Sequence, residues 1–302
     1  MSGNTRYADW IAVDWGTSNM RAWAMDGARS KAEAQSGKGM GALRPDEFEG
    51  ALLEVIDPWL GCDPTPVVAC GMVGAMQGWA EAAYTKVPAQ PVGAEPTVPV
   101  VTDPRLQVAI LPGLCQEAPA DVMRGEETQI AGFLAGDPGF DGVLCLPGTH
   151  TKWVQISAGE VVSFRTFMSG EMFALMSDHS VLRHSLGDGW DEGAFEGAVS
   201  DALARPEALA ARFFSLRAEG LLHGLAPDAA RARLSGLLIG AELAAARPYW
   251  LGQRIALIGA ARLSGLYANA LALQGVTVET ADATQTTLAG LTAAYHRLKD
   301  TQ

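Results

Sequence analysis

The chain has 302 residues, of which 48% are hydrophobic and 19% charged, so it is long enough for about two domains and too apolar for disorder. Its formal net charge of −12, without a run of Lys or Arg, argues against nucleic acid and anionic membranes as partners. No apolar run reaches the length of a membrane span, and the polar start Met1–Asp9 lacks the pattern of a signal peptide. We therefore expect a soluble cytoplasmic protein. The four cysteines form no CxxC pair and the five histidines no metal-binding spacing, which disfavours a zinc site.

The first half begins with a predicted strand–hairpin–strand unit. An apolar run from Ile11 leads into Gly-Thr-Ser, alternating residues follow to an Asp-Gly turn, and 28–36 completes a three-stranded meander. The remaining pattern predicts a helix over 45–60, a strand over 66–70, irregular loops over 71–104, a strand over 107–111 and a helix over 124–134.

The segment 137–142, Asp-Pro-Gly-Phe-Asp-Gly, is the strongest break signal, and we place a domain boundary there, between 1–138 and 139–302. After it the strand, Gly-Thr turn and two further strands recur 132 residues downstream, with Gly148 in the place of Gly16. Such a repeat predicts two related α/β domains. Later elements are predicted as helices over 171–186, 191–203, 206–224, 228–246, 260–274 and 283–299, with strands over 254–258 and 276–280.

The first Gly-Thr turn is a candidate phosphate site. Gly16 lets the backbone turn closely, and Thr17 and Ser18 supply hydroxyls and N–H groups that can cradle an anion. Asp14, just before the turn, could hold a magnesium ion through water. The alternative is an ordinary hairpin preceded by an aspartate.

The second Gly-Thr turn, Gly148 and Thr149, occupies the matching position without a preceding acid. Lys152 could meet a phosphate charge, or it could be a solvated strand lysine. His150 could contact phosphate or play a structural role. Two related turns are a more specific signal than one, because together they could hold a triphosphate with backbone dipoles.

Glycines mark two further places in the second half. Gly259 lies between a strand and a helix, where it could let an adenine ring approach the backbone. Gly236 and Gly240 lie within a predicted helix at a cost of roughly 1 kcal/mol each relative to Ala. The two glycines indicate that a neighbouring group approaches this helix closely. We favour another helix over a nucleotide as that neighbour.

Other candidates come from the first half. Glu126 and Glu127 open the predicted helix, where one carboxylate could accept or position a hydroxyl proton, and Arg124 could pair with a substrate carboxylate. The alternative is an acidic first turn that the helix dipole favours. In the loop after the strand ending at Cys70, Gln77 and Trp79 suit a sugar, although Trp79 could equally be a packed surface residue.

These motifs resemble the 2-dehydro-3-deoxygalactonokinase family, within the superfamily of sugar kinases, heat-shock chaperones and actin. The resemblance covers about residues 10–298, and the segments that carry it are IAVDWGTSNMRAW, GMVGAMQGW, DVMRGEETQIAGF, LPGTHTKWV, FMSGEMFALMSDHSVL and LSGLLIGAEL.

The resemblance implies two actin-like (ribonuclease H-like) domains with a nucleotide cleft between them. It implies ATP-dependent, Mg²⁺-dependent phosphorylation of the 6-hydroxyl of 2-dehydro-3-deoxy-D-galactonate in galactonate catabolism. Position by position, it implies a first phosphate motif at Asp14, Gly16, Thr17 and Ser18, a second at Gly148 and Thr149, and an adenosine motif at Gly259. Gly125-Glu126 stands where related sugar kinases carry Gly-Asp, so either Glu126 or Glu127 is the expected catalytic carboxylate.

The expected partner is thus a small sugar acid, held by Arg124 and Gln77 with Asn19 or Arg21. The gluco epimer of the substrate is the main alternative, followed by a phosphatase or polyphosphatase of the same fold. The sequence leaves the oligomeric state open, a homo-oligomer included.

Overall fold

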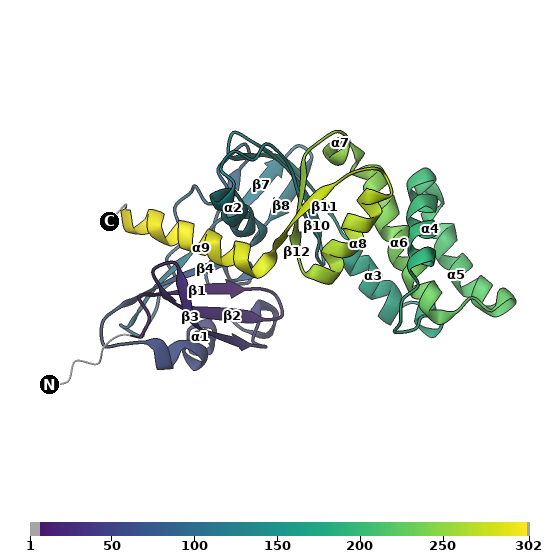
Figure 1. Ribbon diagram of the computed structural model, residues 1–302. Coiled ribbons are helices and arrows are strands. Elements are labelled where there is room, and N and C mark those ends of the chain that lie inside the picture. Colours follow the sequence, from purple (N-terminus) through teal and green to yellow (C-terminus); the bar gives the residue numbers. More distant parts are fainter. Residues whose placement is uncertain (1–6, 301–302) are drawn as a thin grey trace. The chain divides into compact units, whose positions relative to one another are not determined.

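A computed structural model describes residues 7–300 of the chain (Figure 1). Residues 1–6 of the polar start discussed above lie outside the described part. The chain divides into two compact units. Unit 1 contains the chain up to Phe140, the short segment Ser157–Ser163 and the chain from Ala283, and unit 2 contains Asp141–Ile156 and Phe164–Asp282.

Unit 1 is built on a five-stranded sheet with the order β3-β2-β1-β4-β6. Its strands are β1 (Trp10–Trp15), β2 (Met20–Asp26), β3 (Arg29–Ser36), β4 (Thr65–Cys70) and β6 (Leu106–Ile110). The first three pair antiparallel, whereas β4 and β6 join in parallel. Apolar cores cover both faces, since Ile11 and Val13 of β1 belong to one cluster and Trp10 and Ala12 to another. This explains why β1 is apolar almost throughout instead of alternating.

The helices of unit 1 are α1 (Phe48–Ile56), α2 (Glu126–Gly136) and α9 (Ala283–Asp300). In Figure 1, α9, the last element of the chain, lies beside α2. The two helices meet at glycines: a Cβ on Gly132 would lie 1.8 Å from the Thr286 carbonyl oxygen, and one on Gly290 would lie 1.9 Å from that of Thr128. The final helix therefore packs on a helix about 150 residues earlier in the chain.

A second, three-stranded sheet in unit 1 corrects the sequence analysis, which predicted only loops over 71–104 and no element between 111 and 124. Its strands are β5 (Tyr84–Lys86), β7 (Gly113–Glu117) and β8 (Ala120–Met123), in the order β5-β7-β8. Strands of three to five residues are too short to establish a hydrophobic period, so the sequence pattern could not reveal them.

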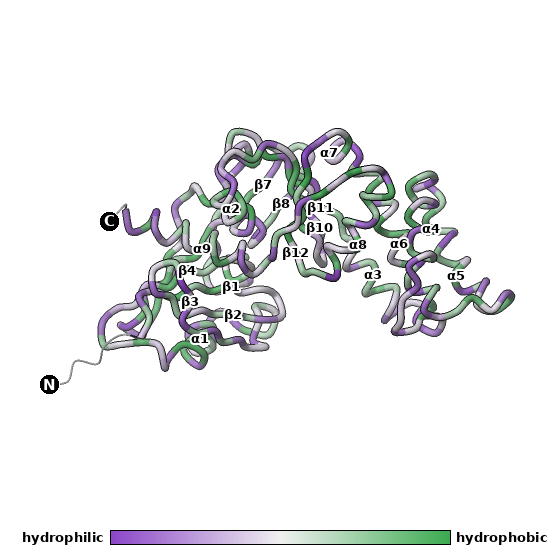
Figure 2. The backbone as a smooth tube through the Cα atoms, viewed as in Figure 1, coloured by the Kyte–Doolittle hydropathy of each residue, from purple (hydrophilic) through white to green (hydrophobic). Residues whose placement is uncertain are grey.

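Unit 2 repeats the strand order of unit 1 as β11-β10-β9-β12-β13. These strands are β9 (Gly142–Leu146), β10 (Thr151–Ser157), β11 (Glu160–Phe167), β12 (Ile255–Gly259) and β13 (Val278–Asp282). Again β9 and β10 pair antiparallel, while β12 joins β9 in parallel. The predicted α/β class with two actin-like domains is confirmed, and Figure 2 shows apolar residues running through the central strands.

The helices of unit 2 are α3 (Ser169–Asp178), α4 (Glu192–Ala204), α5 (Leu209–His223), α6 (Pro227–Ala245), α7 (Arg247–Trp250) and α8 (Ala261–Ala272). The helix predicted over 171–186 is wrong in its second part. It ends at Asp178, and a 3₁₀ turn over Val181–His184 follows, capped by the Ser180 hydroxyl, which accepts from the Leu182 N–H at 3.0 Å.

The neighbour of the two helix glycines is α4, as the sequence analysis favoured. A Cβ on Gly236 or on Gly240 of α6 would lie 2.4 Å from a carbonyl oxygen of α4, that of Phe195 or Val199 respectively. Helix α6 is buried over most of its length, because it packs against α4 and also against α3 and α5. Across residues 7–300, none of the helices combines the length and apolarity that a bilayer crossing requires.

Candidate active site

The first Gly-Thr turn joins β1 to β2 and exposes Thr17 and Ser18. The Gly16 N–H donates to the Asn19 carbonyl at 2.9 Å, which closes the turn. The chain after β3 then braces it, because Gly39 packs so tightly that a Cβ there would lie 2.3 Å from the Thr17 carbonyl oxygen. The chain after β3 therefore fixes the turn, while Thr17 and Ser18 stay exposed.

The second turn, between β9 and β10, is braced in the same way. The Glu171 N–H donates to the Thr149 carbonyl at 2.9 Å, and a Cβ on Gly170 would lie 2.2 Å from the Gly148 carbonyl oxygen. His150 is exposed, and its Nε2 lies 2.5 Å from Oε2 of Glu171. In both units, backbone that follows the third strand thus holds a Gly-Thr turn in place.

Lys152 lies on β10, three residues beyond the exposed Thr149. Its side chain is only 5% exposed, and Nζ donates to the Thr166 hydroxyl at 2.9 Å. The alternative of a solvated strand lysine is therefore wrong, whereas a phosphate contact stays a prediction.

Asp14 stands at the end of β1 directly opposite Arg21 of β2. The Arg21 guanidinium donates to Asp14 Oδ2 at 2.7 Å and to the Thr284 hydroxyl at 2.9 Å. The Cys70 thiol approaches the other carboxylate oxygen, Oδ1, at 4.0 Å. Arg21, predicted as a substrate ligand, is thus engaged in orienting Asp14. Asn19, the other predicted ligand beside it, is exposed at the turn.

The ends of β1 and β4 and the start of α2 converge through two glycines. Gly71, which follows β4, has φ +93°, and a Cβ there would lie 2.8 Å from the Trp15 carbonyl oxygen. Gly125, which precedes α2, has φ +106°, and a Cβ there would lie 3.3 Å from the Gly71 Cα. Only glycine fits both the backbone angle and the space, so this junction brings the acidic helix start beside the strand that carries Asp14.

The two glutamates at this helix start differ in exposure. Glu126 is partly exposed and accepts the Arg124 N–H at 3.1 Å. Glu127 is fully buried and accepts the Gly125 N–H at 2.7 Å and the Thr128 hydroxyl at 3.2 Å. Burial, assisted by the charge of Glu126, raises the pKa of Glu127 to about 8. Of the two side chains, only that of Glu126 reaches solvent.

Arg124 is 8% exposed, and its guanidinium lies 4.3 Å from the centre of the Tyr84 ring. Nη2 donates to the Ala82 carbonyl at 2.7 Å, but Nε and Nη1 are buried without a hydrogen-bond partner. No carboxylate within residues 7–300 forms an ion pair with it. A buried cation in this state is costly unless an anion reaches it.

The loop after β4 places Gln77 and Trp79 differently. Gln77 is exposed, whereas Trp79 stacks on Phe48 with ring centres 6.3 Å apart and meets the edge of Trp15. Trp79 therefore belongs partly to the core, and its role against a sugar stays a prediction.

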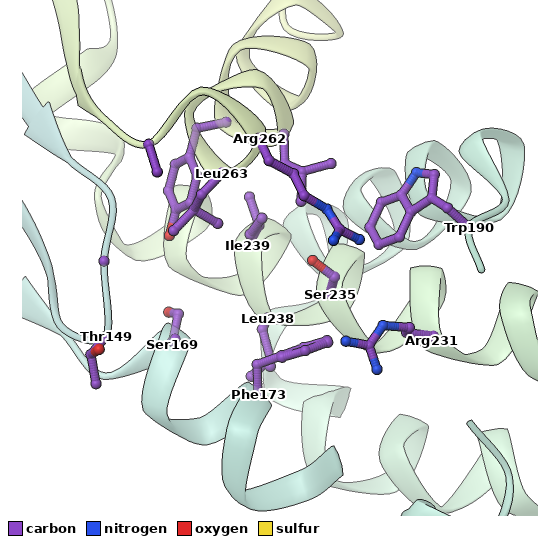
Figure 3. A pocket seen from close by; sticks show the side chains of 15 residues that line it. Thr149, Ser169, Phe173, Trp190, Arg231, Ser235, Leu238, Ile239, Arg262 and Leu263 are labelled. Carbon is purple, nitrogen blue, oxygen red and sulfur yellow. The ribbon is translucent and has the colours of Figure 1, made fainter. Parts of the chain in front are cut away.

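Unit 2 contains a cavity of about 380 Å³ beside the second turn, within the size range of small-molecule sites. Figure 3 shows Thr149 and Ser169 at one end, and Trp190, Arg231 and Arg262 at the other. Apolar side chains form much of the wall: Phe173, Leu238, Ile239, Leu263 and Leu266.

The predicted adenosine residue, Gly259, does not line this cavity, but the next residue, Ala260, does. A Cβ on Gly259 would instead lie 2.8 Å from the Ser264 hydroxyl oxygen. The sequence analysis missed Trp190, Arg231 and Arg262, because single residues spread over three segments form no motif.

Two units of the same strand order, each with a braced Gly-Thr turn, define a protein of the actin-like fold with phosphate-binding candidates in both units. The model of the 2-keto-3-deoxy-galactonokinase family matches residues 14–294, and the chain belongs to this family.

Relatives with curated names cover nearly the whole chain. It is 40% identical over 298 residues to "Probable 2-dehydro-3-deoxygalactonokinase DgoK1" of Rhizobium meliloti (strain 1021), covering 94% of this chain and 96% of the relative. It is 35% identical over 295 residues to the 2-dehydro-3-deoxygalactonokinase of Escherichia coli (strain K12), covering 96% and 98%. The chain is also similar to the "Crystal structure of a putative 2-dehydro-3-deoxygalactonokinase protein from Sinorhizobium meliloti", with a TM-score of 0.88, 39% identity and 96% coverage of both chains.

Proposed function

We propose that this protein is an ATP-dependent kinase that phosphorylates the 6-hydroxyl of 2-dehydro-3-deoxy-D-galactonate, producing the 6-phosphate and ADP. The observation that carries the proposal is the near-full-length match to a family whose curated relatives bear this activity in their names. The partly exposed Glu126 beside the strand end of Asp14 supports it with a plausible chemical group.

Unit 2 is proposed to bind ATP. Backbone N–H groups and the hydroxyl of the Gly148–Thr149 turn would meet the phosphates, with Lys152 adding a positive charge from β10. The cavity next to the turn would take the adenosine, with Ala260, after Gly259, at its wall and Arg262 and Trp190 at its far end. Flat apolar walls with a few polar groups suit a purine ring.

Asp14 is the proposed magnesium ligand, acting through water. One carboxylate oxygen is paired with Arg21, and the other, which the Cys70 thiol approaches at 4.0 Å, would also hold a coordinated water. Magnesium prefers oxygen ligands and keeps several waters, so phosphate and water would supply the rest of its coordination. When bound, Mg²⁺ would neutralise phosphate charge. Thr17 and Ser18, on the Gly16 turn after Asp14, would add phosphate contacts.

Glu126 is the proposed base. As the substrate hydroxyl oxygen bonds to the γ-phosphorus, the bond from that phosphorus to the ADP oxygen breaks, and the hydroxyl proton passes to Glu126. Glu127 is too deeply buried to reach a substrate, and its hydrogen bonds to Gly125 and Thr128 suit a supporting role.

The sugar acid is proposed to be held in unit 1. Arg124 has unpartnered N–H groups and no carboxylate of its own, and a substrate carboxylate would provide the missing charge. Gln77 and Asn19, both exposed, would donate to sugar hydroxyls, and the edge of Trp79 would pack on the carbon chain. A cytoplasmic location and a homo-oligomer both stay predictions.

The test is ADP release with 2-dehydro-3-deoxy-D-galactonate and, separately, with its gluco epimer. We expect turnover with the galacto acid, and turnover with the gluco acid alone would reassign the substrate. No ADP release with either acid would overturn the proposal.

Residue roles are tested by comparing Glu126→Gln, Glu127→Gln and Glu54→Gln, the last an exposed glutamate paired with Lys38. Loss of the base should lower kcat by about 100-fold or more for Glu126→Gln. The Glu54 variant should match the wild type. A 100-fold loss confined to Glu127→Gln would move the base to that residue.

A further inference from the structure

A fully hydrogen-bonded carboxyl group lies inside unit 2, on α6. Glu242 is 3% exposed, its Oε1 accepts the Trp153 indole N–H at 2.8 Å, and its Oε2 accepts the Tyr267 hydroxyl at 2.9 Å. The Ser169 side chain hydrogen-bonds the same carboxyl. The proposed kinase reaction uses none of these contacts.

Two of the three donors, Trp153 and Ser169, lie on segments that form or support the second Gly-Thr turn. Trp153 lies on β10, which leaves the turn directly. Ser169 opens α3, whose next residue, Gly170, packs on the Gly148 carbonyl.

Tyr267 extends the same network toward the turn. Its hydroxyl also lies 2.9 Å from the hydroxyl of Thr151, the first residue of β10. One carboxyl group thus links the strand leaving the turn to the helix start that braces it.

The carboxyl group is itself held on a rigid support. Gly240, two residues before Glu242, is in backbone contact with α4, so α6 cannot shift without breaking that packing. Ser169 and Tyr267 also line the cavity beside the turn.

Stability alone does not account for this arrangement. Burial raises the pKa of Glu242 to about 7, which records the cost of placing a carboxylate here, and the neighbouring titratable groups Cys145 and Tyr267 are buried as well. Apolar replacements of buried charged groups are often neutral or stabilising, so such a group is better explained by what it orients.

We propose that Glu242 is a positioning residue that fixes the Gly148–Thr149 turn for the triphosphate of ATP. The inference rests on the proposed nucleotide site in unit 2. It predicts that loss of the carboxyl network weakens phosphate binding much more than binding of the nucleoside part.

The experiment measures ATP and adenosine affinity by calorimetry for the wild type, Glu242→Gln and Trp153→Phe. The matched control is Trp250→Phe. Trp250 is 3% exposed, belongs to the same core as Trp153, and also donates one indole hydrogen bond of 2.8 Å, but to the Leu243 carbonyl.

We expect Glu242→Gln and Trp153→Phe to weaken ATP binding by about 10-fold or more, because small misplacements of a site have effects of this size. Adenosine affinity should fall much less than ATP affinity in both variants, because Ser169 and Tyr267 are only two of the residues that line the cavity. Trp250→Phe should leave both affinities near wild type. If Glu242→Gln does not fold, Trp153→Phe decides, since it keeps the carboxyl group and most of the ring.

Equal loss of ATP and adenosine affinity, or no loss of ATP affinity, would overturn the inference. Calorimetry needs no turnover, so this result is separate from the test of the proposed function. A wild-type protein that binds ATP but phosphorylates neither sugar acid would refute the kinase proposal and leave the role of Glu242 standing.

Discussion

Replacing Glu127 with glutamine should remove a pH dependence from the stability of unit 1. The carboxyl group is fully buried, and burial raises its pKa from an ordinary 4.5 to about 8. The folded protein therefore keeps a proton that the unfolded chain loses above pH 4.5. Its contribution to stability is complete below that pH and is lost progressively as the pH rises toward 8.

The size of the effect follows from the two pKa values. At about 1.4 kcal/mol per pH unit, burial disfavours the ionised form by about 5 kcal/mol in total. Between pH 5.5 and 7.5 the wild type should lose about 2 to 3 kcal/mol through this group alone. For a unit of this size that corresponds to about 5 to 10 °C in melting temperature. A neutral amide in the same place does not titrate, so Glu127→Gln should lack this loss.

Thermal unfolding of both proteins at pH 5.5, 6.5 and 7.5 measures the difference. Other titrating groups, including the buried Glu242, contribute equally to both proteins and cancel. Glu54→Gln, which removes an exposed carboxylate, serves as the control and should follow the wild type. If the melting temperatures of Glu127→Gln and the wild type fall in parallel from pH 5.5 to 7.5, then Glu127 is not held protonated and the argument from burial is wrong.

Two further predictions use glycine pairs as internal controls. Gly132→Ala should destabilise the protein by about 3 kcal/mol or more in chemical denaturation, since the new methyl group would lie 1.8 Å from a carbonyl oxygen of α9. Gly136→Ala in the same helix meets open space and should be neutral or stabilising, so equal losses would contradict the packing argument. Gly39→Ala should weaken ATP-dependent turnover by about 10-fold or more, because it displaces the first Gly-Thr turn. At Gly37 an added Cβ would meet no atom within 4 Å, so Gly37→Ala should keep wild-type turnover. A wild-type rate in Gly39→Ala would refute the bracing role.

Much of the fold follows from local sequence patterns. Both hairpins and their third strands were predictable because Gly-Thr turns and short apolar runs are local signals, and their recurrence suggested the duplicated strand order. The break after Asp178 had a local signal that the sequence analysis overlooked, because Ser177, Asp178, His179 and Ser180 are weak helix formers and Ser180 caps the next turn. The small sheet β5-β7-β8 depends on pairing between short segments, which leaves no local period.

The residue types of the candidate site were predictable from the sequence. The burial and the partners of the individual residues were not. Adjacent glutamates at a helix start read alike in the sequence, and only packing shows that Glu127 is buried while Glu126 reaches solvent. Similarly, the sequence did not reveal that Arg21, a predicted substrate ligand, pairs with Asp14, which only the strand register shows. Trp190, Arg231 and Arg262 come together around one cavity from separate segments, and that proximity exists only after folding.

The duplicated turns bear on how a chain with a net charge of −12 would bind phosphates. Strand pairing sets Arg21 opposite Asp14 in unit 1, and Lys152 opposite Leu146 at the matching place in unit 2. In unit 1 the cation and the acid form an ion pair at 2.7 Å and partly offset each other. In unit 2 an apolar residue stands at the paired position that the acid occupies in unit 1, and the buried Lys152 donates to the Thr166 hydroxyl at 2.9 Å. The duplication thus supplies two similar backbone turns whose flanking strands differ in residue type at one paired position. The overall negative charge then says little about either turn, because a screened surface charge acts weakly over distances beyond about 10 Å, whereas these residues act at contact.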